Sequence, residues 1–312
     1  MTRPPHRHTP PMREGVSASC VALPAGPWPT MADFLAQRLP AVSRDHWLQR
    51  MAQGRVLDEE GRPLSPDSAH RPGTRVYYYR ELPAEPVIPF AEEVLFQDAH
   101  LLVADKPHFL PVTPGGGYVQ QTLLVRLKRR TGLESLSPIH RIDRETAGLV
   151  VFSVRPQDRG AYQALFREQV VEKVYEAIAA LRPELPLPAI YRSRIEPDDT
   201  RFFRQREVSG EPNSETGIEL MQRHGELARY RLRPHSGKTH QLRVHMNALG
   251  RPIEGDRFYP DVRHGPGADK EDYSRPLQLL AQSMAFVDPV TGEARSFASR
   301  RRLSLEPPSA AA

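Results

Sequence analysis

The 312-residue chain has a single cysteine, Cys20, which excludes an internal disulfide and a zinc site built on cysteine thiolates. It has no apolar run of about 18 residues, which excludes a helix that crosses a membrane. The first 29 residues lack the apolar core of a signal peptide. These absences predict a cytoplasmic protein with reduced thiols and no membrane contact.

Lysine is also scarce. Five lysines, at positions 106, 128, 173, 238 and 270, leave 38 of the 43 basic residues as arginine. Arginine is the better bidentate ligand for phosphate. A GC-rich genome, however, raises arginine and proline together, and the chain has 32 prolines. The arginine excess and the formal net charge of +5 therefore give only weak support for a nucleic-acid partner.

The first 82 residues divide into a proline-rich arm and a small folded unit. Residues 1–29 carry several prolines and no apolar period, which predicts a disordered arm. Thr30 and Ser43 then each suit the N-cap of a short helix. Short strands are predicted at residues 55–57 and 75–79. The sequence therefore predicts a domain at residues 30–82 with two helices and a β-ribbon.

Residues 83–303 form the longer predicted domain. Strands are predicted at residues 94–96, 101–104, 149–154, 172–180 and 230–233, and helices at residues 121–130, 162–169 and 240–249. The region 183–215, rich in proline and arginine, gives no clear assignment. Because the elements follow no strict β-α-β rhythm, we expect an α+β fold rather than a doubly wound one. Residues 304–312 are predicted to be a disordered tail.

One polar loop leads directly into a largely apolar strand. Residues 140–148 read His-Arg-Ile-Asp-Arg-Glu-Thr-Ala-Gly. Arg141 and Arg144 flank Asp143 and are predicted to hold its carboxylate ionised, because a nearby opposite charge favours the charged form. An ionised carboxylate on a rigid strand end can attack or stabilise an electron-poor sugar carbon. The local chemistry alone fits a structural ion pair better.

Two further motifs follow in order. Residues 172–177 read Glu-Lys-Val-Tyr-Glu-Ala, and residues 237–245 read Gly-Lys-Thr-His-Gln-Leu-Arg-Val-His, with Gly-Asp at residues 255–256. With the loop at residues 140–148 they resemble the RluA family of RNA pseudouridine synthases. The resemblance implies an isomerase with a mixed, largely antiparallel sheet flanked by helices, and with no cofactor or metal.

The resemblance also assigns roles. Asp143 matches the catalytic aspartate, Tyr175 the tyrosine that lies against the target base, and Arg243 the arginine that pairs with the aspartate. It leaves open whether Asp143 attacks C1′, attacks the base or removes a sugar proton. The residues expected to contact the substrate are His140, Arg141, Arg144, Thr146, Lys106, Lys238, His240 and Gln241.

The unit at residues 30–82 is similar to the S4 RNA-binding module. The likeness lies in Leu-Pro-Ala-Val-Ser-Arg at residues 39–44 and Gly-Arg-Val-Leu at residues 54–57. The residues expected to bind RNA there are Arg38, Arg44, Arg50 and Arg55.

Three features depart from the family pattern. Lys238 stands where arginine is usual, and His108 and Phe109 replace small residues. Leu280 stands where histidine is common, so we expect one histidine contact to be missing. None of these changes touches Asp143 or the two residues matched with it.

Together these observations predict a monomeric enzyme that isomerises specific uridines in structured RNA. The first candidate substrate is 23S rRNA, and the second is a tRNA anticodon stem-loop. One alternative is a non-catalytic RNA-binding or ribosome-assembly factor. Another is a hydrolytic N-glycosidase, which would need a second carboxylate to activate water.

Overall fold

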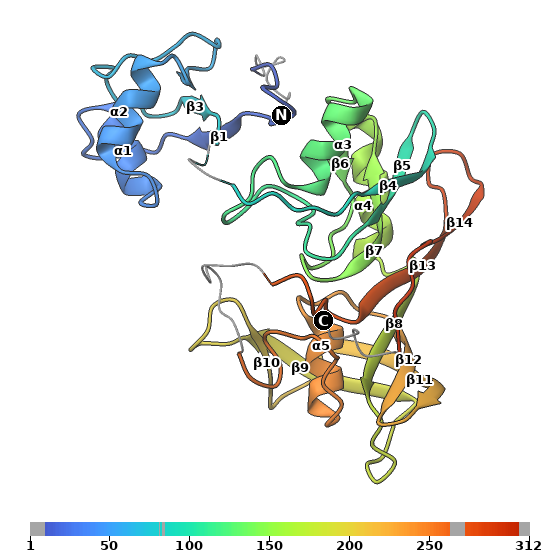
Figure 1. The fold of residues 1–312 in the computed structure, drawn as a ribbon. Helices are drawn as coiled ribbons and strands as arrows, with labels where there is room; N and C mark the ends of the chain where they lie inside the picture. Colours follow the sequence, from blue (N-terminus) through green and yellow to red (C-terminus); the bar gives the residue numbers. More distant parts are fainter. Residues whose placement is uncertain (1–9, 81, 83–84, 263–271, 306–312) are drawn as a thin grey trace.

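The computed structural model describes residues 10–80, 82, 85–262 and 272–305, and it shows a small N-terminal unit beside a larger part (Figure 1). The predictions made for residues 1–9 and 306–312 lie outside these residues. The helices are α1 (Met31–Arg38), α2 (Arg44–Ala52), α3 (Leu123–Thr131), α4 (Arg159–Arg167) and α5 (Gln241–Ala248), with a 3₁₀ turn at Pro156–Asp158. In this part of the chain, no helix has the length and apolar character needed to span a bilayer.

An 11-stranded sheet organises the larger part, in the order β10-β9-β11-β12-β8-β13-β7-β5-β4, with β14 paired to β13 and β6 to β7. Its strands are β4 (Glu93–Gln97), β5 (Leu101–Lys106), β6 (Ser137–Pro138), β7 (Ala147–Ser153), β8 (Glu172–Ala180), β9 (Ile190–Pro197), β10 (Gln205–Val208), β11 (Ser214–His224), β12 (Leu227–Pro234), β13 (Leu279–Val287) and β14 (Ala294–Ala298). Strands β13 and β7 pair in parallel, and the other described pairs are antiparallel. The predicted α+β class and largely antiparallel sheet are confirmed.

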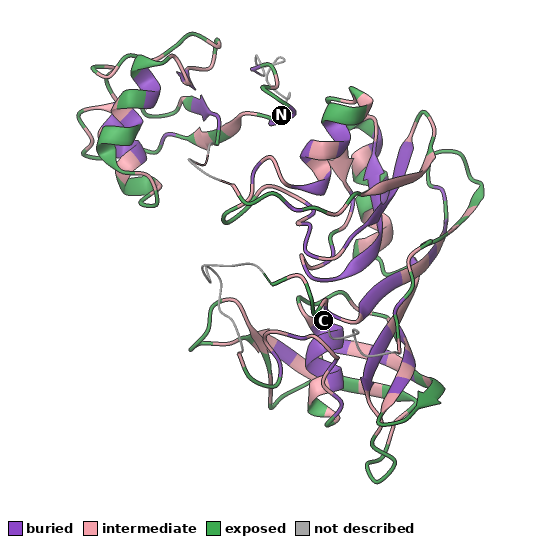
Figure 2. Cartoon of the chain, in the orientation of Figure 1, coloured by how far each residue is buried: buried purple, intermediate pink, exposed green. Residues whose placement is uncertain are grey.

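Strand β7 is covered on both faces, which explains its continuous apolar sequence. Val150 and Phe152 share a core cluster with leucines of α3. Leu149 and Val151 share another with Tyr162 of α4. Because side chains alternate between the two faces of a strand, a strand with helices on both sides must be apolar throughout. Figure 2 shows the buried stretch that results.

Helix α5 covers the other half of the sheet. Leu242 and Met246 on this helix pack with Ala177 of β8 and with Tyr230 and Leu232 of β12. Strand β13 pairs with both β8 and β7 and so joins the two halves of the sheet. The polar loop before β7 lies next to the N-terminal end of α5, since Asp143 in the loop is 3.9 Å from His240, the residue that precedes the helix.

Gly148 is required where β7 meets β13. Its φ is +108°, in a region that favours glycine, and a Cβ at this position would collide with the carbonyl group of Ala281. The parallel register pairs Ala281 with Gly148. The glycine that ends the polar loop thus lets the two strands approach closely.

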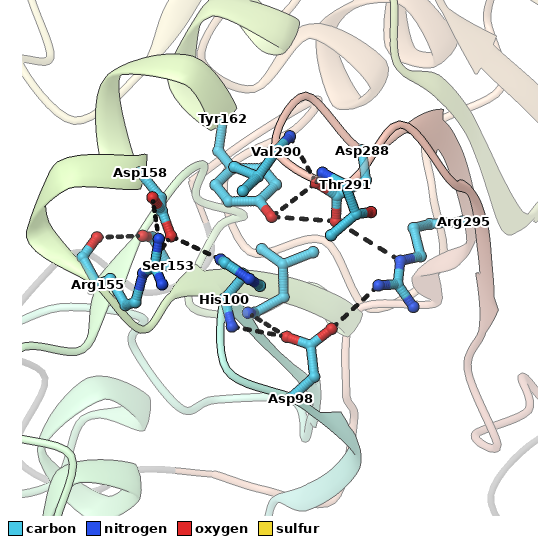
Figure 3. Close-up of polar contacts among 11 residues, drawn as sticks. Asp98, His100, Ser153, Arg155, Asp158, Tyr162, Asp288, Val290, Thr291 and Arg295 are labelled. Carbon is cyan, nitrogen blue, oxygen red and sulfur yellow. Dashed lines mark hydrogen bonds and ion pairs between the residues drawn. The ribbon is translucent and has the colours of Figure 1, made fainter.

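A polar network ties α4 to the hairpin of β13 and β14 (Figure 3). The hydroxyl of Tyr162 donates to the buried carboxylate of Asp288, with oxygen–oxygen distances of 2.9 and 3.0 Å. Arg295 lies between Asp288, at 3.5 Å, and Asp98 in the turn before β5, at 3.1 Å. Each buried charge in this network therefore has a partner, as burial requires.

The N-terminal unit has a sheet of three strands in the order β1 (Ser19–Ala22), β3 (Arg75–Tyr78) and β2 (Val56–Leu57). The predicted caps are confirmed, because the hydroxyls of Thr30 and Ser43 accept backbone N–H groups at the starts of α1 and α2. The predicted disorder of residues 1–29 is wrong for β1. This strand has no apolar period of its own and is ordered by pairing with β3, more than fifty residues later.

The segment before β1 contacts both parts: the Tyr79 hydroxyl donates to Pro11 O and Arg13 lies over the Tyr79 ring in the N-terminal unit, while the next residues pack on the larger part. Val16 is buried against Val125 of α3, and Lys128 Nζ donates to Ser17 Oγ at 3.0 Å. The Glu85 carboxylate, after β3, accepts three successive backbone N–H groups just before α3, at 2.6 to 2.9 Å. The chain therefore crosses between the two parts twice, and both crossings are anchored at α3.

Candidate active site

A pocket of about 300 Å³ opens where the loop before β7, strand β8 and the start of α5 meet. Asp143, Tyr175 and Arg243 all line it, although they are far apart in sequence. Of the residues expected to contact the substrate, His140, Arg141, Thr146, Lys238, His240 and Gln241 also line the pocket, and Lys106 and Arg144 do not. The three motifs therefore converge on one cavity.

Arg243 connects two carboxylates. It is 1% exposed, and its Nε and Nη2 donate to the two oxygens of Asp256 at 2.8 and 2.7 Å. Its Nη1 lies 3.3 Å from Asp143 Oδ2. The turn after Asp256 adds backbone N–H donors from Phe258 and Tyr259 to the same carboxylate. Asp143 is therefore bonded to a guanidinium whose other two nitrogens are already held.

Sequence reasoning did not assign Asp256 to the site. A signal was present, because Gly-Asp at residues 255–256 continues the third motif. The bidentate pairing with Arg243, thirteen residues earlier, depends on how the loop after α5 folds back, and no local pattern reports that.

The charge of Asp143 is set by residues distant in sequence. Burial raises the pKa of Asp143, but His240, Arg243 and Lys106 outweigh burial and hold that pKa below its usual value. The carboxylate is therefore ionised at neutral pH. His240 Nε2 lies 3.9 Å from Asp143 Oδ2.

The predicted role of Arg141 and Arg144 in holding that charge is wrong. Arg141 is exposed at the pocket wall. Arg144 Nε donates to Glu145 at 2.9 Å, and its Nη1 donates to the Tyr118 hydroxyl at 2.6 Å. Side chains of neighbouring residues in an irregular loop point in different directions. Arg141 and Arg144 are therefore close to Asp143 in sequence, but within the described part of the chain their guanidinium groups do not pair with its carboxylate. The absence of Arg144 from the pocket has the same cause.

Tyr175 presents a neutral ring to the pocket. Burial, together with the charge of Asp143, raises the pKa of Tyr175. Its phenol therefore stays protonated at neutral pH. The ring also packs against both the α3 core and the α5 core, which fixes its orientation at the junction of the two halves.

His140 lines the pocket and also supports the loop. Its Nε2 accepts the backbone N–H of Val151 at 3.1 Å, and its ring stacks on Phe166 with centroids 4.6 Å apart. Burial, with a smaller effect of Lys173, lowers the pKa of His140 to about 3. The imidazole is therefore neutral in the working pH range.

Gln241 fixes the loop that precedes α5. Its Oε1 accepts from Lys238 N at 3.1 Å, and its Nε2 donates to Glu215 O and to Thr216 Oγ1, both at 3.0 Å. Gln241 thereby uses its amide within the protein, while Lys238 is exposed at the rim.

Leu280 occupies the position where a histidine is common in the family, and the structure shows where that position lies. Leu280 packs with Ala147, Ile178 and Leu303 and does not line the pocket, whereas Leu279 does. Side chains alternate along a strand, so position 280 faces away from the pocket. The histidine contact expected to be missing therefore concerns the side of β13 that faces away from the described pocket lining.

The four arginines of the N-terminal unit have different environments. Arg38 is exposed at the end of α1, and Arg55 is half-buried before β2. Arg44 Nε donates to Asp33 at 2.7 Å. Arg50 is buried with its guanidinium over Trp47, so its prediction as an RNA contact is wrong. Its guanidinium instead packs over the buried Trp47 ring inside the unit.

A metal site is not evident in the described part of the chain, which has no cluster of three or more His, Cys, Asp or Glu side chains suited to hold an ion.

Lys106 supports the loop from behind, so its prediction as a substrate contact is wrong. It is fully buried, and its Nζ donates to Pro107 O and Arg144 O, both at 2.9 Å. Burial lowers the pKa of Lys106 to about 7, although Glu145 and Asp143 oppose this shift. The loop is therefore held by a lysine that changes charge near neutral pH.

We expect Lys106→Met to remove a pH dependence of stability. Between pH 7 and 10.5 the unfolded lysine still binds a proton that the folded lysine has released. The wild-type free energy of unfolding should therefore rise relative to that of the variant, by at most about 1.4 kcal/mol per pH unit. Urea unfolding of both proteins at several pH values across this window measures the difference. Parallel profiles would show that Lys106 titrates normally.

Comparison with known proteins identifies the family. The RNA pseudouridylate synthase family matches residues 100–248. The dual-specificity RNA pseudouridine synthase RluA of Haemophilus influenzae is 32% identical over 222 residues, covering 69% of this chain and 94% of that protein. Ribosomal large subunit pseudouridine synthase D of Neisseria meningitidis is 26% identical over 277 residues, covering 84% of this chain and 73% of that protein.

A solved structure supports the fold. Human RNA pseudouridylate synthase domain containing 1 matches with a TM-score of 0.55 at 21% identity, covering 70% of this chain and 86% of that chain. The chain belongs to the RNA pseudouridine synthase family, as an RluA-like isomerase that converts uridine to pseudouridine in RNA.

Proposed function

We propose that the chain modifies uridines of large-subunit ribosomal RNA, as a cytoplasmic monomer, with a tRNA anticodon stem-loop as a second substrate. Asp143, Tyr175 and Arg243 carry the chemistry. The observation that carries this proposal is the ionised Asp143, bonded to a held Arg243 inside one pocket. The Neisseria enzyme, whose name gives the ribosomal large subunit as its target, supports the ribosomal substrate. Its alignment covers 84% of this chain and therefore extends beyond residues 83–303.

The reaction rearranges bonds without adding or removing atoms. The N1–C1′ bond of uridine breaks, the uracil turns while it is held, and C5 bonds to C1′. The proton that C5 carried is then lost, and N1 takes up a proton, so the composition is unchanged. The nucleotide must first leave its stack to enter the pocket. Exposed cations at the rim, Arg141 and Lys238, can hold the flanking phosphates.

The protein contributes charge, orientation and an aromatic face. Asp143 stays ionised and pointed into the pocket because Arg243 holds it. Asp256 prevents Arg243 from turning toward solvent or toward a phosphate. Tyr175 offers a neutral face against which the uracil stacks while it turns.

The arrangement disfavours the hydrolase. Asp143 is the one acidic residue among the described residues that line the pocket. Asp256 is buried and saturated by Arg243 and two backbone N–H groups. A second carboxylate that could activate water is therefore missing from the described pocket lining.

We predict that Asp143→Asn abolishes pseudouridine formation and leaves the fold intact, because the amide keeps the shape of the side chain and loses its charge. Total RNA lacking pseudouridine is incubated with enzyme, and pseudouridine is mapped by chemical labelling. The wild type should leave the RNA mass unchanged and release no uracil.

Asp67→Asn is a matched control, because this carboxylate is exposed in a loop of the N-terminal unit. Turnover by a folded Asp143→Asn variant would remove Asp143 from the chemistry. Free uracil would indicate the hydrolase. RNA binding by the wild type without any pseudouridine would indicate a non-catalytic binding factor.

We predict that Arg243→Lys lowers turnover at least ~100-fold, a rise in the barrier of about 2.7 kcal/mol. Lysine keeps the charge but cannot span Asp256 and Asp143 with a planar fork. RNA affinity should change much less, since Arg243 is buried and its guanidinium is held by Asp256 and Asp143. Single-turnover rates and dissociation constants separate these effects.

Asp256→Asn tests the ion pair of Arg243 and Asp256 by changing the carboxylate instead of the guanidinium. If Asp256 acts only by positioning Arg243, a double variant with both Asp256→Asn and Arg243→Lys should turn over no more slowly than Arg243→Lys alone. The first substitution would then already have removed the effect that the second one removes. Additive losses would give Asp256 a separate role. Equal losses in binding and turnover for Arg243→Lys would place Arg243 on the RNA backbone.

We propose further that the S4-like unit at residues 30–82 docks the RNA through its exposed arginines. Arg38→Ala should lower the slope of log affinity against log salt by about 0.7 to 0.9, the value of one phosphate contact. Arg50→Ala is the control. It should lower the free energy of unfolding and leave the slope unchanged, because Arg50 packs on Trp47. An unchanged slope in Arg38→Ala would exclude Arg38 from the contact.

A further inference from the structure

The hairpin of β9 and β10 carries an unusual side chain at its tip. Phe202 is 87% exposed, more than any other large hydrophobic side chain in the described part of the chain. Single exposed apolar residues are common and need no explanation by themselves. The neighbours of Phe202 distinguish it from such a case.

A row of rings connects the tip to the pocket. The ring centroids of Phe202 and Phe203 are 5.4 Å apart, and those of Phe203 and Phe258 are 5.0 Å apart. Phe258 lies 5.8 Å from His240, which lines the pocket beside Asp143. The exposed ring is therefore the outer end of an aromatic surface that begins at the pocket wall.

The base of the hairpin is held against the site. The Tyr259 hydroxyl accepts from Gln205 N and lies 2.9 Å from Gln205 O, and it also lies 3.1 Å from His240 Nδ1. Arg204 Nη2 donates to Pro260 O at 3.2 Å. The backbone that carries the rings is thus held at the base of the hairpin before any ligand binds, which limits the entropy lost on binding.

The charges around the tip suit a nucleic acid. Arg201 is exposed directly before the two phenylalanines. Two acidic residues also lie there, but both are engaged within the hairpin. The Asp198 carboxylate accepts from the backbone N–H and hydroxyl of Thr200, and Asp199 pairs with Arg206. Exposed aromatic rings beside arginine are the elements that bind single-stranded nucleic acid.

The geometry points to a stacking platform, formed by Phe202 and Phe203, for an unpaired RNA base next to the target uridine. A nucleotide that leaves its stack deprives its neighbour of a stacking partner. An aromatic ring that continues the surface of the pocket replaces that partner whatever the base is. This inference rests on the proposed function, because the neighbouring base reaches the hairpin only when a uridine occupies the Asp143 pocket.

Binding is measured in an Asp143→Asn background, where no turnover occurs. The probe is a short RNA hairpin whose loop consists of uridines and one 2-aminopurine, a base whose fluorescence is quenched on stacking. Protein with Phe202 should quench the probe. Adding Phe202→Ala should abolish the quenching and weaken binding about ten-fold, whereas Phe202→Trp should keep both.

Val287→Ala is the matched control, because Val287 is another exposed apolar side chain, at the end of β13. It should leave binding and quenching unchanged. Urea unfolding should show equal stability for Phe202→Ala, since the side chain is largely in solvent. Equal affinity and quenching with and without Phe202 would overturn the platform.

The result is separable from the proposed function. Pseudouridine formation by wild-type protein, together with unchanged binding by Phe202→Ala, defeats the platform alone. Quenching that depends on Phe202, in a protein whose wild type forms no pseudouridine, upholds the platform and defeats the proposed chemistry.

Discussion

The site depends on one buried guanidinium shared between two carboxylates. An unpaired charge inside a protein costs several kcal/mol, so Arg243 can be buried only while its partners stay in place. Asp256 supplies the bidentate partner, and the rings of Phe258 and Tyr259 lie within 5.0 and 5.4 Å of the guanidinium. Arg243 must keep both carboxylate partners to remain buried. Its ion pairs therefore hold together the loop before β7, helix α5 and the turn after Asp256. The Asp143 carboxylate is oriented as a result of this linkage.

Local patterns predicted those elements whose causes are local. The caps Thr30 and Ser43 act within three residues, and β7 is buried on both faces, so both could be read directly from the chain. Strand β1 and the hairpin of β9 and β10 could not. Strand β1 has too few apolar residues to show a periodic pattern. In β9 and β10, arginines obscure the alternation of apolar and polar residues that is typical of a strand. Both are ordered by strands that lie elsewhere in the sequence.

The same distinction holds for the site. The motifs placed Asp143, Tyr175 and Arg243 in one pocket, because motif resemblance carries information about contacts distant in sequence. Reasoning from neighbours in the loop failed, since the charges that act on Asp143 come from β5 and from the start of α5. Lys106 shows why residue type is insufficient. A lysine in a motif suggests a phosphate contact, yet burial turned it inward to carbonyl oxygens.

The double crossing at α3 has a consequence for how this protein could diversify. A domain joined by a single linker can be gained, lost or exchanged by recombination at one point. Here Val16 and Ser17 lie on α3, while the strand that follows them completes the sheet of the N-terminal unit. A replacement of that unit must therefore bring its own strand and keep the α3 contact, or expose the apolar face beneath it. Gain, loss or exchange of the unit in this chain therefore involves two joints rather than one.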